Sequence, residues 1–349
     1  MENNKRLFWI DNLKGLMILL VVISHCLFLS YYDPQTKYVC DTYHYFFLSF
    51  FSYVFFGVSG YLFELRKKGN ASVYSMIRRE IQLIFPTMII SVVDVLLFSG
   101  CKLNSFPYTD RNVLFNVVRF SSLKEFIMLV IWVAYSYWFM WIIAAIYFVH
   151  FILEHILSNV WITIITIGAY VCAIVCNQPV LGKFIISYWG FLIGILIRKK
   201  KSNVQFNKRC FMFSAIFYLV YSVTVYNILG FDTISNALIK MPMAVSSTFV
   251  FMLCFRKIFN RKNILFSIMG KESLSIYLIH WELFLWLGNW IALRFNWSGG
   301  GGICLGLGLS ILCIIISVLV VKILNYIPIA RYIFHQSQLL DRITKGKIV

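Results

Sequence analysis

The sequence predicts an all-α, polytopic transmembrane helical bundle of about ten spanning helices, built as a single membrane-embedded domain over residues 1–349. Of the 349 residues, 60% are hydrophobic and 13% are charged, whereas soluble domains carry about 25% charged residues. Apolar runs of spanning length recur along the chain, and basic residues gather in alternate connections between them. The chain is therefore predicted to be an integral membrane protein.

The predicted spans are hydrophobic runs of roughly 17 residues or more. They cover residues 8–30, 45–65, 80–98, 136–154, 160–177, 182–198, 210–229, 236–255, 273–293 and 303–325. A shorter apolar stretch, 121–135, is expected to be an interfacial or re-entrant piece. The first span has full length and lacks a small-residue cleavage site, so we expect it to stay in the protein.

The net charge of +18 has a topological explanation. If the N-terminus is cytoplasmic, about two thirds of the 32 basic residues fall in the inner connections and about a fifth in the outer ones. This bias fits the positive-inside rule with both termini in the cytoplasm. Because the basic excess follows topology, the charge does not indicate nucleic acid as a partner.

The first span carries two polar residues, Lys14 and His25. Eleven helical residues correspond to three turns plus about 20°, so both side chains lie on one face, roughly 16 Å apart along the axis. Polar groups in hydrocarbon are costly, which favours a functional site. The structural alternative is a lysine that snorkels to the interface and a histidine that bonds a neighbouring helix.

Five further positions are candidates. Asp94 stands out as an acid well inside a predicted span, where such residues mark functional sites by default. His280 follows Tyr277 by three residues, hence on the same helix face, with a packing histidine as the alternative. Asp11 is expected to cap the first helix or to orient the lysine amine three residues later. Trp138 is expected to line a substrate cavity or to belong to an interfacial aromatic belt.

Five short pieces of sequence stand in order along the chain. They are the lysine–ten residues–histidine spacing within the first span, VFFGVSGYLF at 54–63, IRREIQLIFP at 77–86, YWFMW at 137–141 and GKESLSIYLIHW at 270–281. Over nearly the whole chain they resemble the motifs of the acyltransferase-3 family of membrane acyltransferases, which O-acylate bacterial surface sugars and other acceptors. Two features depart from that pattern. No Pro precedes the aromatic residues of the second piece, and Gln82 replaces the second Arg of an Arg-x-x-Arg pair.

The resemblance implies an O-acyltransferase that takes an acyl group, most simply acetyl, from cytoplasmic acyl-CoA such as acetyl-CoA. The implied acceptor is a hydroxyl of an envelope glycan or glycolipid precursor, and the implied location is the inner membrane of a bacterial cell. His25 is the expected general base, since imidazole suits that role near neutral pH, and Lys14 is its expected catalytic partner. Acyl-CoA is a co-substrate, and no permanently bound cofactor or metal is expected.

Arg78 and Arg79 are expected to bind the CoA phosphates, because Arg pairs phosphate in a bidentate way. Their alternative role is plain positive-inside topology. Ser59 is a further candidate, since it opens the Ser-Gly-Tyr end of the second motif.

The rival hypothesis is a multi-pass transporter or flippase of an envelope polymer. Transporters typically show repeated halves with broken helices, and neither is visible in this sequence. The sequence leaves open the acceptor hydroxyl, the acyl chain, a homo-oligomeric state, the membrane face where the acceptor binds, and the pairing of Cys40 with Cys101.

Overall fold

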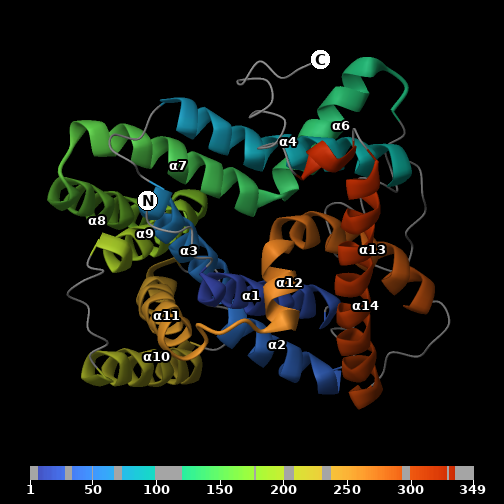
Figure 1. Cartoon of the computed structure of the whole chain (residues 1–349). Coiled ribbons are helices and arrows are strands. Elements are labelled where there is room, and N and C mark those ends of the chain that lie inside the picture. Colours follow the sequence, from blue (N-terminus) through green and yellow to red (C-terminus); the bar gives the residue numbers. More distant parts are fainter. Residues whose placement is uncertain are drawn as a thin grey trace. The chain divides into compact units, whose positions relative to one another are not determined.

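A computed structural model describes residues 7–27, 34–48, 50–66, 73–98, 120–176, 178–199, 208–229, 237–292, 299–327 and 330–334. Every regular element in these residues is a helix, which confirms the all-α prediction for the described part of the chain (Figure 1). The helices, in chain order, are α1 (Phe8–Cys26), α2 (Pro34–Leu48), α3 (Phe51–Arg66), α4 (Val73–Phe98), α6 (Leu123–Ser136), α7 (Trp138–Ile156), α8 (Asn159–Val175), α9 (Pro179–Lys199), α10 (Lys208–Leu229), α11 (Ala237–Ile258), α12 (Ile264–Lys271), α13 (Ser273–Ala292) and α14 (Gly299–Tyr326), followed by the 3₁₀ turn η3 (Ala330–Ile333).

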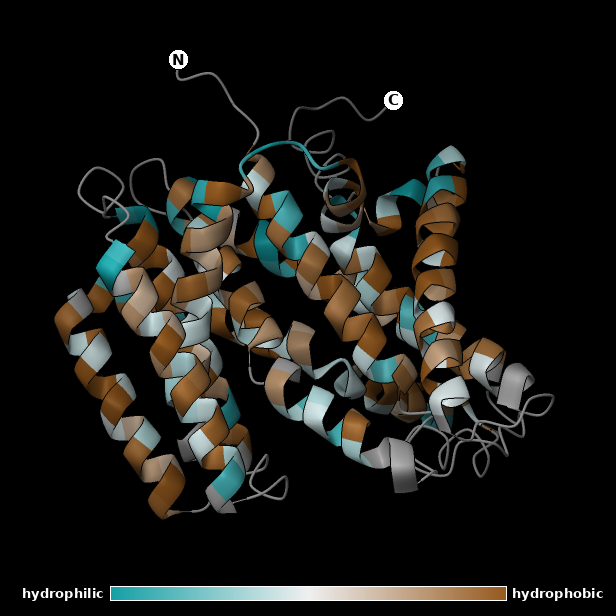
Figure 2. Cartoon of the chain, turned by 90° about the horizontal axis from the view of Figure 1, so that it is seen from below, coloured by the Kyte–Doolittle hydropathy of each residue, from teal (hydrophilic) through white to brown (hydrophobic). Residues whose placement is uncertain are grey.

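In the part of the chain that the structure describes, seven helical stretches are long and apolar enough to cross a membrane: 8–26, 38–66, 76–97, 138–156, 180–199, 241–258 and 300–326. Apolar residues dominate along most of the helices (Figure 2). The other three predicted spans coincide with shorter apolar helices at 160–175, 211–227 and 273–285. A multi-pass membrane protein is thus supported, while the count of ten spans and the cytoplasmic termini stay predictions.

Several predicted boundaries shift in the structure. The helix of the first span ends at Cys26, and residues 28–30 of that predicted span lie outside the described residues. The apolar piece predicted at 121–135 is α6, a helix of 14 residues. Residues 99–119, which include Cys101, also lie outside the described residues, so the structure does not address the pairing of Cys101 with Cys40.

The chain forms two compact units. Unit 1 comprises Met1–Leu20, Asp41–Ala71 and Ala145–Lys271, and unit 2 comprises Val21–Cys40, Ser72–Ala144 and Glu272–Val349. Three of the five boundaries between the units fall inside α1, α2 and α7. A single membrane-embedded domain over 1–349 remains a prediction.

Within unit 1, α3 packs closely along α9. Three glycines make this approach possible: a Cβ at Gly60 would overlap the Phe191 carbonyl, and one at Gly194 would overlap the Gly57 carbonyl, while Gly190 faces the Tyr53 carbonyl. Small residues that let helix backbones approach are typical of membrane helix pairs. α11 also packs against α3, α9 and α10.

The first turns of α1 are fixed in unit 1 by backbone-to-backbone packing on α12. A Cβ at Gly15 would overlap the Phe266 carbonyl, and one at Gly270 would overlap the Asp11 carbonyl. Residue numbers rise along one helix as they fall along the other, so the two helices are antiparallel. Asp11 lies inside the first turn of a helix that begins at Phe8, so the prediction that it caps α1 is wrong.

Asn12 forms a second attachment of α1. Its side-chain amide donates to the carbonyls of Phe259 and Arg261, each at 2.8 Å, and the residue is 1% exposed. These carbonyls belong to the non-helical link before α12, where no helical N–H is available to them. One buried amide therefore satisfies two backbone acceptors that would be costly to bury alone.

Within unit 2, α13 packs along α14, and α4 contacts α6 and α13. α4 contains Pro86, which removes one helical N–H, and Ser91 and Thr87 bond backbone carbonyls one turn earlier. Between α6 and α7 the chain leaves helical geometry only at Tyr137, whose φ and ψ are −80° and 49°. The last turn of α1 meets α14 where Gly306 lies against the Cys26 carbonyl.

Candidate active site

The last turn of α1 places His25 against α13 within unit 2. Nδ1 of His25 lies 2.7 Å from Nε2 of His280. The two rings are nearly parallel, with 6° between their planes and 5.0 Å between their centroids. The distance between the centroids exceeds the distance between the two nitrogens by about two ring radii. The rings therefore lie side by side in nearly one plane and share a hydrogen bond between their edges, rather than stacking face to face.

The second histidine is held firmly by its own helix. Nδ1 of His280 lies 2.8 Å from the carbonyl oxygen of Ile276, and the residue is 1% exposed. The Tyr277 ring lies 6.0 Å from the His280 ring, and Trp281 sets its ring nearly perpendicular to His25, with centroids 5.0 Å apart. His25 thus contacts two consecutive residues of α13, His280 and Trp281, and Tyr277 packs against the first of them.

A second polar cluster in unit 2 centres on the hydroxyl of Tyr137. This oxygen lies 2.8 Å from Oδ2 of Asp94 and 2.8 Å from Oε1 of Glu282, and 3.3 Å from the carbonyl of Leu278. Asp94 is 2% exposed and Tyr137 is 3% exposed. A phenol hydroxyl can donate one hydrogen bond and accept another. Tyr137 can therefore hydrogen-bond to both carboxyl groups when one of them is protonated and donates to the hydroxyl oxygen.

The sequence analysis identified only Asp94 of these three residues. Glu282 also lies inside a predicted span, and the rule that singled out Asp94 applies to it equally. Tyr137 opens one of the quoted motifs but carries no charge that would mark it. Neither side chain reveals from sequence that the two meet, Tyr137 from the junction of α6 and α7 and Glu282 from α13.

The comparison with family models decides the class of protein. The model described as an acyltransferase domain matches residues 7–322 of the 349. The chain belongs to the acyltransferase-3 family. Comparisons with curated proteins and with solved structures gave no match.

This acyltransferase carries the two basic candidates on the first half of α4 in unit 2. Arg78 and Arg79 are half-buried, and Nη1 of Arg79 donates to Oε1 of Gln82 at 3.4 Å. Gln82, which replaces the family's second Arg, therefore faces the guanidinium that remains. Fifteen residues separate Arg79 from Asp94, about 22 Å on an ideal helix, so the basic pair and the carboxyl cluster lie at opposite ends of α4.

The remaining predicted site residues are placed separately. Lys14 is half-buried on the part of α1 that belongs to unit 1, and Ser59 is 9% exposed on α3, where its carbonyl accepts from the Tyr147 hydroxyl at 3.2 Å. Trp138 begins α7 with its ring centroid 6.0 Å from that of Phe139. The roles of these residues stay predictions.

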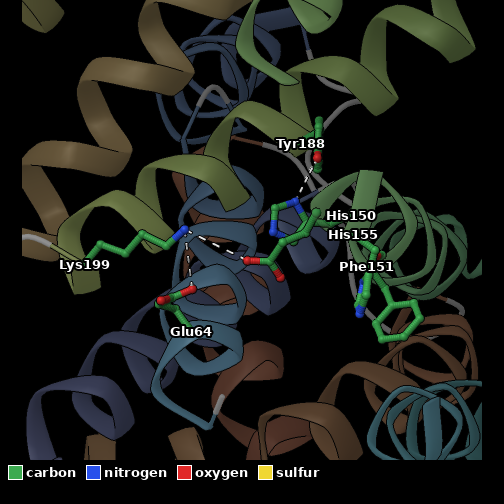
Figure 3. Close-up of polar contacts among 7 residues, drawn as sticks. Glu64, His150, Phe151, His155, Tyr188 and Lys199 are labelled. Carbon is green, nitrogen blue, oxygen red and sulfur yellow. Dashed lines mark hydrogen bonds and ion pairs between the residues drawn. The ribbon is translucent and has the colours of Figure 1, made fainter. Parts of the chain in front are cut away.

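Unit 1 of the acyltransferase has a polar cluster of its own (Figure 3). Nζ of Lys199 lies 3.9 Å from Glu64 and 4.0 Å from Glu154, so one cation joins α9 to α3 and α7. One turn before Glu154, His150 bonds the Tyr188 hydroxyl at 2.9 Å through Nδ1. In the described residues, no group of three or more His, Cys, Asp or Glu side chains could hold a metal ion.

Proposed function

We propose that this acyltransferase moves an acyl group, most simply acetyl, from cytoplasmic acyl-CoA to a hydroxyl of an envelope glycan or glycolipid precursor. Membership of the family supports acyl transfer in general. The observation that supports a base-catalysed transfer is the hydrogen bond between His25 and a buried second imidazole. A positioned imidazole is the side chain best suited to accept a hydroxyl proton near neutral pH.

The proposed reaction balances without an external acid or base. His25 accepts the proton of the acceptor hydroxyl, and the hydroxyl oxygen attacks the thioester carbonyl. The carbon–sulfur bond breaks, and the CoA sulfur leaves with the proton that the imidazolium returns. The products are an O-acyl ester and CoA, and His25 ends neutral.

The proposed donor site uses the basic residues of the inner side. Arg78 and Arg79 lie within the first two turns of α4, where the predicted topology places the cytoplasm. Lys14 lies in the first half of α1, which the predicted topology places toward the cytoplasm, and His25 lies roughly 16 Å farther along the same helix. An extended pantetheine arm has about that reach, so the thioester could approach His25 while the nucleotide stays at the inner surface.

The base assignment is tested by His25→Ala in purified protein, with CoA release and acceptor acylation as readouts. Loss of a positioned base lowers turnover by on the order of 10²–10⁴-fold. The matched control is His155→Ala, which removes an exposed histidine whose described hydrogen bond goes to a carbonyl of its own helix. Near wild-type turnover by a folded His25→Ala protein would refute the assignment.

The donor site is tested by Arg79→Ala with CoA binding as the readout. We expect weaker binding, with a difference that shrinks at high salt, because phosphate contacts are screened. Lys262→Ala removes an exposed basic residue of the predicted cytoplasmic side and serves as control. If wild type and Arg79→Ala bind CoA equally, Arg79 does not contribute to CoA binding, and its position is explained by the positive-inside rule alone.

A further inference from the structure

We propose that His280 is a positioning residue that fixes the tautomer of His25, so that Nε2 of His25 is the nitrogen that accepts the hydroxyl proton. This inference rests on the proposed function. It adds which of the two nitrogens acts and which residue decides it.

The assignment starts at the backbone. The carbonyl oxygen of Ile276 only accepts hydrogen bonds, and it lies 2.8 Å from Nδ1 of His280. Nδ1 of His280 must therefore carry a proton. A neutral imidazole has one N–H, so Nε2 of neutral His280 presents a lone pair.

The lone pair of His280 then determines the state of His25. Its Nε2 lies 2.7 Å from Nδ1 of His25, with the two rings nearly coplanar. A hydrogen bond needs one donor and one acceptor, so Nδ1 of His25 donates. In neutral His25 the remaining nitrogen, Nε2, carries the lone pair and can accept a proton. The hydrogen bonds thus form a chain that runs in one direction, from His25 to His280 and from His280 to the carbonyl.

This chain also stabilises the charge that develops during the reaction. When Nε2 of His25 accepts a proton, the ring becomes cationic, and its Nδ1–H bond to His280 becomes charge-assisted and stronger. A carboxylate in this place, as in the Ser-His-Asp triad, would do the same. A neutral imidazole does so without a buried negative charge, which would be costly in a 1% exposed position.

The test compares His280→Gln with His280→Leu. The Gln amide oxygen can occupy the place of Nε2 and accept from His25, whereas Leu fills space and offers no acceptor. We expect His280→Gln to keep turnover within about tenfold of wild type, and His280→Leu to lose on the order of 10²–10⁴-fold in kcat with KM for acyl-CoA unchanged. Equal loss in both variants, or wild-type kcat in His280→Leu, would overturn the proposal.

A second measurement needs no substitution at position 280. In protein with ¹⁵N-labelled histidine, the His25 signals are identified by their absence in His25→Gln. The proposal predicts a protonated Nδ1 and an unprotonated Nε2 in the resting enzyme, and the opposite pattern overturns it. If His25→Gln is inactive while His280→Leu is fully active, this inference fails and the base assignment survives. A fully active His25→Gln would instead refute the base assignment on which this inference rests.

Discussion

The glycine contacts between α1 and α12 predict a large effect from one added methyl group. In Gly15→Ala the new Cβ would meet the carbonyl and Cα of Phe266, which are backbone atoms that no rotamer change can move. Overpacking of this kind costs about 1–3 kcal/mol. The higher helix propensity of Ala offsets at most about 1 kcal/mol of it. We therefore expect a net loss of stability and an outward shift of α1.

Gly168→Ala is the matched control, because Gly168 lies in α8 with nothing within 4 Å of an added Cβ. Gly168→Ala should gain stability from the higher helix propensity of Ala and should create no overlap. Unfolding midpoints in detergent and turnover are the assays. α1 carries His25, and misplacement by about 1 Å can cost on the order of 10²-fold in rate, so Gly15→Ala should also be slow.

The double variant tests the reasoning further. Gly15 and Gly270 separate the same two helices, so a shift that relieves one overlap also relieves the other. The loss of stability in the double variant should therefore be smaller than the sum of the losses in the two single variants. A Gly15→Ala protein as stable and active as Gly168→Ala would refute the close packing described here.

Four other perturbations follow from the described contacts. Asn12→Ala should lower stability by about 1–3 kcal/mol in chemical denaturation, because it removes two part-buried hydrogen bonds. Tyr137→Phe should cost a similar amount by removing the hydroxyl that joins two carboxyl groups, about 1–3 kcal/mol. Lys199→Gln should cost under about 1 kcal/mol, and less in high salt, since its contacts are long and partly exposed. Hydrogen bonds from the backbone and side chain of Ser121 lower the pKa of Glu125. These bonds should therefore order the start of α6 at neutral pH and be lost on acidification, which amide hydrogen exchange would show as faster exchange. An unchanged exchange rate in Glu125→Gln would contradict this.

Composition and periodicity were enough to predict the long apolar helices, because apolar runs of spanning length have few alternatives in a membrane. They did not predict α12, and the predicted span 45–65 includes only the end of α2. The helices α4, α9 and α14 cover the predicted spans and extend beyond them by a few residues. The ends are harder to predict, as α1 shows by stopping at Cys26. Nothing in the apolar run before residue 30 marks that stop.

The site was only partly accessible to sequence reasoning. His25 and His280 each appeared as candidates, but 255 positions separate them and no local rule links their side chains. Asn12 was missed because Asn is common near the start of a helix. Its role depends on hydrogen bonds to two carbonyls that are distant in the sequence. Gly194 was missed because a glycine's role in close packing depends on which backbone lies opposite it.

Acyl transfer from cytoplasmic acyl-CoA to an envelope hydroxyl can be followed in membrane vesicles. Sealed vesicles of known orientation receive acyl-CoA labelled in the acyl group on the cytoplasmic face, and acceptor on the other face. The account predicts base-labile label in the acceptor, with one CoA released per ester formed, and no label with vesicles that contain His25→Ala. Passage of the acceptor across the membrane with no ester label and no CoA release would contradict it and favour a transporter.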